Sequence, residues 1–106
     1  MNISELRETL GTLDIPVRYR AFNVGEVPSL PYLLYYTTDN QGTLKADNHN
    51  YAKAYNLTLE LYSEEKDLEL EEKLEALLDA NNIEHDTFES YLDTESMYEV
   101  AYDITI

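Results

Sequence analysis

Between positions 51 and 82 the spacing of apolar residues changes from a period of two to the period of a helix. Every second residue from Tyr55 to Leu61 is apolar and the residues between them are polar, which is typical of a strand with one buried face. Further along, four leucines fall on one side of a helix: Leu70, Leu74, Leu77 and Leu78. Asp67 is placed to cap the start of this helix, and Asn81–Asn82 can supply the left-handed residue that ends it. The pattern therefore predicts a strand followed by a helix that packs on it.

The same reasoning predicts the other elements. A first helix should carry an apolar stripe from Ile3 to Leu13, begin at a cap on Asn2 or Ser4, and end near Asp14. Strands are predicted at four further places: Val17–Phe22, Tyr32–Thr38, Ile83–Leu92 and Met97–Ile106. The order α-β-β-β-α-β-β predicts one α+β domain over residues 1–106, a mainly antiparallel sheet packed by two helices. Its core should include four residues where the second helix crosses the sheet: Leu59, Leu74, Leu77 and Tyr102.

Acidic residues outnumber basic ones by 22 to 7, for a net charge of -15. The excess lies in the C-terminal part, because residues 64–106 hold 15 acids and 2 bases whereas residues 1–63 hold 7 acids and 5 bases. Such a chain repels nucleic-acid phosphate. Most of the charge is expected to form a solvated surface, and the sharper alternatives are a surface that DNA slides past or one that mimics DNA. No apolar run approaches the ~20 residues that span a membrane, and the N-terminus lacks the features of a signal peptide, so we expect cytosolic synthesis.

Residue patterns typical of catalysis or metal binding are missing from the sequence. There is no cysteine, and His49 and His85 each lack a second histidine at ligand spacing. The segment Asp39–Asn50 is rich in oxygen ligands, but when Gly42 is placed at position 6 of an EF-hand loop, Thr37 and Asn48 fall where the loop requires Asp and Glu. Glu71 and Glu72 are adjacent carboxylates, but both are expected to face solvent as ordinary surface charge. We therefore expect no catalytic activity, no cofactor and no metal.

Tyrosine is unusually frequent, with ten residues and no tryptophan in the chain. Six tyrosines gather around the second and third predicted strands: Tyr32, Tyr35, Tyr36, Tyr51, Tyr55 and Tyr62. A half-buried sheet accounts for most of them, but tyrosine is also enriched at the centre of protein interfaces. We therefore expect a tyrosine-rich outer sheet face that can pair with copies of the chain.

Four stretches carry a resemblance to a known family: YNLTLELYSEEKDLELEEKLEALLDANNIEHD, IPVRYRAF, PSLPYLLYY and SMYEVAYDITI. Over nearly its whole length the chain resembles the small tail-component proteins encoded in the structural-gene clusters of siphophages and prophages of Gram-positive bacteria. Leu68 departs from the pattern, because a proline would be expected after Asp67. The element order is also similar to that of phage tail-terminator, or tail-completion, proteins. In those proteins an α+β subunit forms a hexameric ring that caps the tail tube and joins it to the head.

The resemblance implies a non-enzymatic structural protein of the virion tail, present in the bacterial cytoplasm during assembly. Its implied partners are further copies of itself, the tail-tube protein and the head-connector protein, with DNA passing through the ring without specific binding. The interface is expected at the connection between the second and third strands and on those strands, through these residues: Tyr35, Asp39, Asn40, Lys45, Asp47, His49, Tyr51 and Tyr55. Two alternatives stay open, an acidic DNA-mimic inhibitor of a nucleic-acid-binding protein and a small adaptor domain that binds a peptide at its sheet edge.

Overall fold

A five-stranded sheet with the strand order β1-β2-β3-β5-β4 organises the molecule. The structure is a computed structural model, and it describes residues 1–38 and 55–106. The elements follow the predicted order: α1 (Ile3–Gly11), β1 (Val17–Tyr19), β2 (Tyr32–Thr37), β3 (Asn56–Ser63), α2 (Leu68–Ala80), β4 (His85–Leu92) and β5 (Met97–Thr105). Only the pair β1·β2 is parallel, and the other three pairs are antiparallel. The α+β class and the element order predicted from the sequence are confirmed.

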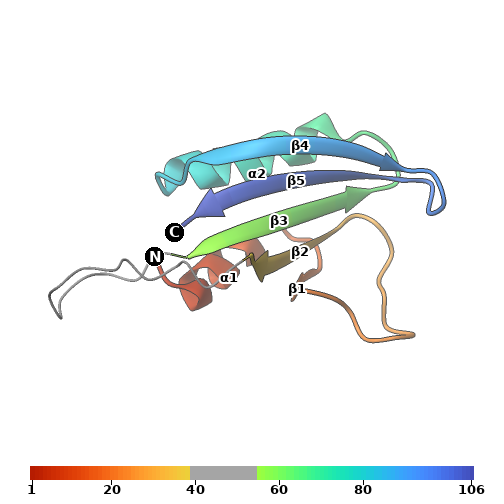
Figure 1. Cartoon of the computed structure of the whole chain (residues 1–106), viewed down its shortest axis with the longest axis horizontal. Helices are drawn as coiled ribbons and strands as arrows, with labels where there is room; N and C mark the ends of the chain where they lie inside the picture. Colours follow the sequence, from red (N-terminus) through yellow and green to blue (C-terminus); the bar gives the residue numbers. More distant parts are fainter. Residues whose placement is uncertain (39–54) are drawn as a thin grey trace, which may run out of the picture.

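Both helices cover the same face of the sheet. Figure 1 shows α1 beside the β1–β2 part of the sheet and α2 beside the β4–β5 part. Leu6 and Leu10 of α1 belong to one buried cluster with Leu74 of α2. The same cluster contains the alternate residues of the three central strands: Leu33, Tyr35, Leu57, Leu59, Leu61, Val100, Tyr102 and Ile104. The period of two in the sequence therefore predicted the buried face of β3 and of β5 correctly.

The ends of the helices are set by local side-chain contacts. The Asp67 carboxylate accepts a hydrogen bond from the Leu70 N–H at 3.1 Å, and Asn82 takes a left-handed conformation with φ 57° just after α2. Both features confirm the predicted boundaries of this helix. At α1, Asn2 and Glu5 form a reciprocal capping box. This helix ends at Gly11, earlier than predicted, and the chain then turns through a left-handed Asp14.

Other details of the predicted elements are also wrong, and β4 begins at His85 instead of Ile83. β1 ends at Tyr19 and does not reach Phe22, because Arg20 adopts φ 65° and turns the chain out of the sheet. Leu77 is only half-buried, whereas Leu74 and its helical neighbours Leu70 and Leu78 are buried. The helix is turned so that its Glu71 side, rather than its Leu77 side, approaches the sheet.

Candidate interaction surface

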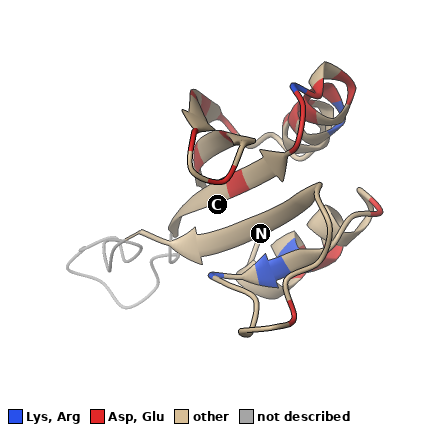
Figure 2. Cartoon of the chain, turned by 90° about the vertical axis from the view of Figure 1, so that its right-hand side faces the viewer, with Lys and Arg blue, Asp and Glu red and all other residues tan. Residues whose placement is uncertain are grey.

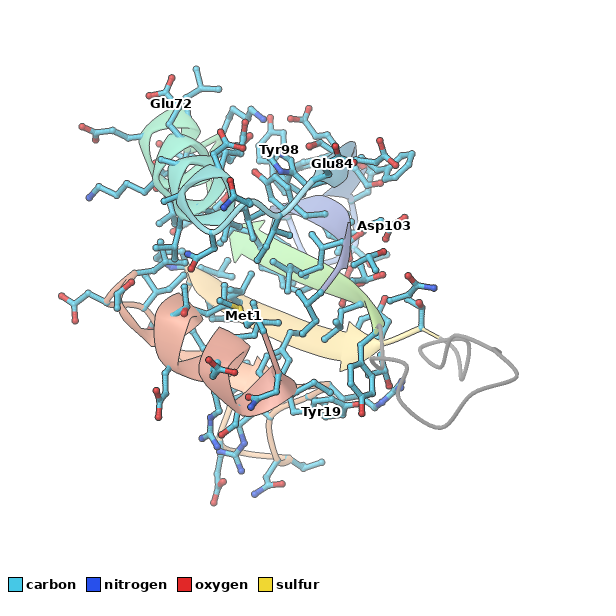
Figure 3. The ribbon with its side chains drawn as sticks, turned by 90° about the vertical axis from the view of Figure 1, so that its left-hand side faces the viewer. Met1, Tyr19, Glu72, Glu84, Tyr98 and Asp103 are labelled. Carbon is cyan, nitrogen blue, oxygen red and sulfur yellow. The ribbon has the colours of Figure 1, made fainter. Side chains whose placement is uncertain are left out.

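The sheet face that neither helix covers is the candidate site, and we call it the open face. Strand alternation and register bring nine central residues to it: Tyr32, Leu34, Tyr36, Thr58, Glu60, Tyr62, Glu99, Ala101 and Asp103. Figure 3 shows Asp103 on the side of the sheet away from the two helices. The open face thus combines aromatic rings with carboxylates on three neighbouring strands.

Hydrogen bonds connect the tyrosines and the carboxylates of the open face. The Tyr36 hydroxyl donates to Glu60 Oε2 at 3.1 Å. The Tyr62 hydroxyl lies 2.8 Å from Glu99 Oε2 and 3.0 Å from Glu60 Oε1. A tyrosine hydroxyl has one hydrogen and can donate to one carboxylate at a time, so these two acids share one donor. Burial, followed by hydrogen bonding to Glu99, raises the pKa of Tyr62 above its usual range, so the phenol stays a neutral donor.

Aromatic contacts hold the β1–β2 side of the open face in place. The guanidinium carbon of Arg20 lies 5.1 Å from the centre of the Tyr36 ring, within the range of a cation–π contact. The centre of the Tyr32 ring lies 5.1 Å from the centre of the Phe22 ring and 5.3 Å from the centre of the Tyr62 ring. These side chains therefore present a fixed aromatic surface next to the acidic pair on the neighbouring strands.

The structure corrects the placement of Tyr35. Its side chain belongs to the core under the helices and is 4% exposed, with its ring edge-to-face against Tyr19 at 5.2 Å. The reason is the alternation of β2, which sends Leu33 and Tyr35 toward the helices and the flanking Tyr36 toward the open face. Tyr55 is partly buried against the core, and its backbone N–H and C=O pair with Ile106. Neither tyrosine lies on the outer sheet surface at which the interface was expected.

The other predicted interface residues lie outside the described ranges: Asp39, Asn40, Lys45, Asp47, His49 and Tyr51. Their proposed role in assembly stays a prediction. Sequence reasoning singled out Tyr62 only as one of many tyrosines and missed its partners Glu60 and Glu99. Glu60 could have been found from the period of two, which puts it on the face of β3 with Tyr62, but nothing local indicates that Glu99 lies opposite Tyr62.

Another correction concerns the adjacent carboxylates of α2. Glu71 is buried, with 7% of its surface exposed, and it accepts a hydrogen bond from Lys66 Nζ at 2.8 Å. Lys66 also pairs with Glu89 of β4, so it joins the start of α2 to the edge of the sheet. Glu72 is exposed, as expected. The buried carboxylate is therefore part of an ion pair that anchors the helix.

A broad, open depression of about 1100 Å³ lies at the end of the sheet where α2 leads into β4. Asp79, Glu84, His85, Asp86 and Asp103 contribute to its lining. Within residues 1–38 and 55–106, no group of three or more histidine or acidic side chains is arranged to hold a metal ion. The depression thus offers carboxylates without a converging set of ligands.

No protein-family model matches the chain, and no curated protein matches it. In the part of the chain that the structure describes, no helix is long and apolar enough to cross a membrane.

Proposed function

We propose that this protein is a non-enzymatic structural component of a phage or prophage tail, a tail terminator or head–tail joining protein that assembles into a ring. Its partners in this role are further copies of itself, the tail-tube protein and the head-connector protein. It acts in the virion after assembly in the bacterial cytoplasm. The observation that carries the proposal is the open face, a sheet surface of ordered tyrosines and carboxylates that neither α1 nor α2 covers.

The chemistry of the open face suits contact with another protein. Tyrosines bury a large area at a small cost in conformational entropy and keep a polar tip, which is why they are enriched at interface centres. Tyr36 and Tyr62 are held by hydrogen bonds to the same carboxylate, Glu60, so little further ordering is needed when a partner binds. The element order α-β-β-β-α-β-β, which resembles that of tail terminators, is consistent with this role.

The distribution of charge also supports a role beside DNA without binding it. Figure 2 shows acidic residues over α2 and the β4–β5 hairpin, and basic residues on β1 across the sheet. A net charge of -15 disfavours attachment to phosphate. Subunits with such a surface could surround DNA in transit without retaining it.

The DNA-mimic alternative receives less support from the acidic helix. A mimic must present free carboxylates to a basic partner. On α2, however, Glu71 accepts a hydrogen bond from Lys66, and Glu75 accepts one from the Tyr102 hydroxyl at 3.0 Å. Two of the helix carboxylates are thus used to attach α2 to the rest of the fold.

Deletion of the gene from its phage or prophage tests the proposal. Electron microscopy should find tails of irregular length that are not joined to heads, and the wild-type protein supplied in trans should restore complete particles. Leu34→Glu, which places a charge in the centre of the open face, should fail to restore them while keeping the wild-type circular dichroism spectrum. Leu68→Glu is the matched control, because Leu68 is already 63% exposed on α2. Normal, infectious particles from the deletion strain would refute the proposal.

A further inference from the structure

The two edge strands of the sheet differ in length, and β4 lacks three features that protect an edge: a bulge, a proline and a lysine. β1 forms one edge with three residues and β4 forms the other with eight. β4 pairs with β5 one residue to one residue throughout, without a bulge, and it contains no proline or lysine. Its Phe88 and Tyr91 are 57% and 51% exposed. A long, regular and exposed edge of this kind is a template for another strand.

Two aspartates of the open face occupy opposite positions in the register at this edge. Asp86 of β4 stands directly opposite Asp103 of β5 in the register. Like charges in this position are destabilising. Asp103 accepts a hydrogen bond from the Thr58 hydroxyl at 2.8 Å, but neither aspartate forms an ion pair within residues 1–38 and 55–106. A cation brought by a neighbouring strand would relieve this repulsion.

The opposite edge of the sheet carries such cations. Arg18 of β1 pairs with Leu34 in the register and therefore lies on the open face, and Arg20 follows two residues later beside Tyr36. Both arginines are exposed, and neither forms an ion pair with another described residue. Figure 2 shows the basic residues of β1 and the acidic residues of the β4–β5 hairpin at opposite sides of the sheet.

Strand direction makes these two edges compatible. β1 is parallel to β2, and each following pair across the sheet is antiparallel, so β1 and β4 run in opposite directions. A rotation about an axis along the strands preserves strand direction. It places β1 of a second copy antiparallel to β4 of the first and keeps the helices of both copies on the same side. The arginines then lie on the same face as Asp86 and Phe88.

We propose that β4 of one copy is extended by the β1 edge of a second copy, with Arg18 and Arg20 of that copy meeting the Asp86–Asp103 pair. The contact is heterologous, because the two surfaces differ, and repetition of such a contact generates a ring when the rotation closes. This inference deepens the proposed tail function and rests on it for ring closure. A two-fold contact between β4 strands is disfavoured, because it would bring the acidic halves of two copies together.

Charge reversal tests the contact. Sedimentation velocity at about 0.15 M salt over a range of concentrations should detect self-association of the wild-type protein. Arg18→Glu and Asp86→Arg should each weaken it at least tenfold, and an equimolar mixture of the two variants should restore it. Lys73→Glu and Glu69→Arg, at exposed positions of α2, make the same charge changes away from both edges and should leave association unchanged. Asp86→Arg should not lower the melting temperature, because it removes the repulsion with Asp103, so a loss of association is not a loss of fold.

Cysteine pairs identify which edges meet, and the natural chain has no cysteine to interfere. Ala21→Cys, just beyond β1, and Thr87→Cys, on β4, are both exposed. In the proposed antiparallel contact Ala21 lies two to four strand residues from Thr87, or about 7–14 Å, so a thiol crosslinker of that reach should join the two variants when they are mixed and neither one to itself. Three results would overturn the inference: a crosslinked product from Thr87→Cys alone, normal association of the Arg18→Glu variant, and a wild-type chain that stays monomeric at every concentration. If these crosslinks form but the deletion strain still makes normal particles, the contact is supported and the tail function is refuted. If the deletion strain has tail defects but no such crosslinks form, the tail function is supported and the contact is refuted.

Discussion

Leu74→Ala measures how firmly α2 is attached to the sheet. Leu74 is fully buried, with 0% of its surface exposed, and packs in the cluster that joins both helices to the central strands. The substitution removes three carbon atoms, worth about 0.8 kcal/mol each in lost burial, or roughly 2.4 kcal/mol. A cavity adds to this cost when the surroundings cannot collapse, so the expected loss in the free energy of unfolding is about 2–5 kcal/mol. For a chain of this length, that corresponds to a drop in melting temperature of roughly 10–20 °C.

Urea unfolding, followed by circular dichroism and by tyrosine fluorescence, measures this loss, because the chain has no tryptophan. Leu77→Ala is the matched control on the same helix. Its side chain is half-buried, so the free energy of unfolding should fall by clearly less than for Leu74→Ala. A loss below about 1 kcal/mol for Leu74→Ala, or equal losses for the two variants, would refute the docking of α2 described above.

Three further predictions concern charge and hydrogen bonding. The pKa of Tyr62 is raised in the folded protein, mainly by burial, so the stability it contributes is complete below the unfolded pKa of about 10 and is lost as the pH rises above that value. Tyr62→Phe should therefore reduce the loss of melting temperature at alkaline pH, and an unchanged pH dependence would contradict the raised pKa of Tyr62. Lys66→Met leaves the buried Glu71 carboxylate without its cation and should lower the free energy of unfolding by about 1–3 kcal/mol at neutral pH in urea unfolding; an unchanged free energy of unfolding would contradict the ion pair. Addition of a chelator at fixed pH and salt should leave the melting temperature unchanged, and a large drop would reveal an ion site.

The candidate site could be predicted only in part. Composition indicated that tyrosines on β2 and β3 serve contacts with other chains, and the period of two could have separated Tyr36 from Tyr35. The run of residues 32–36 is apolar on both faces, however, so its periodicity does not say which face the helices cover. That choice depends on the packing of Leu6 and Leu10, which lie more than twenty residues away in the chain.

By itself, the sequence determined the elements that depend on near neighbours. The caps at Asn2 and Asp67 and the left-handed Asn82 act within a few residues, and the spacing of leucines assigns each helix its apolar side except at the half-buried Leu77. Only the tertiary structure decided which residues of different strands meet. Tyr62 stands opposite Glu99 because β3 pairs with β5 in one particular register, and a shift of one residue would send each side chain to the other face. That register is selected by the burial of the whole core, a sum of contacts between distant parts of the chain, and so it cannot be seen in any single stretch of the sequence.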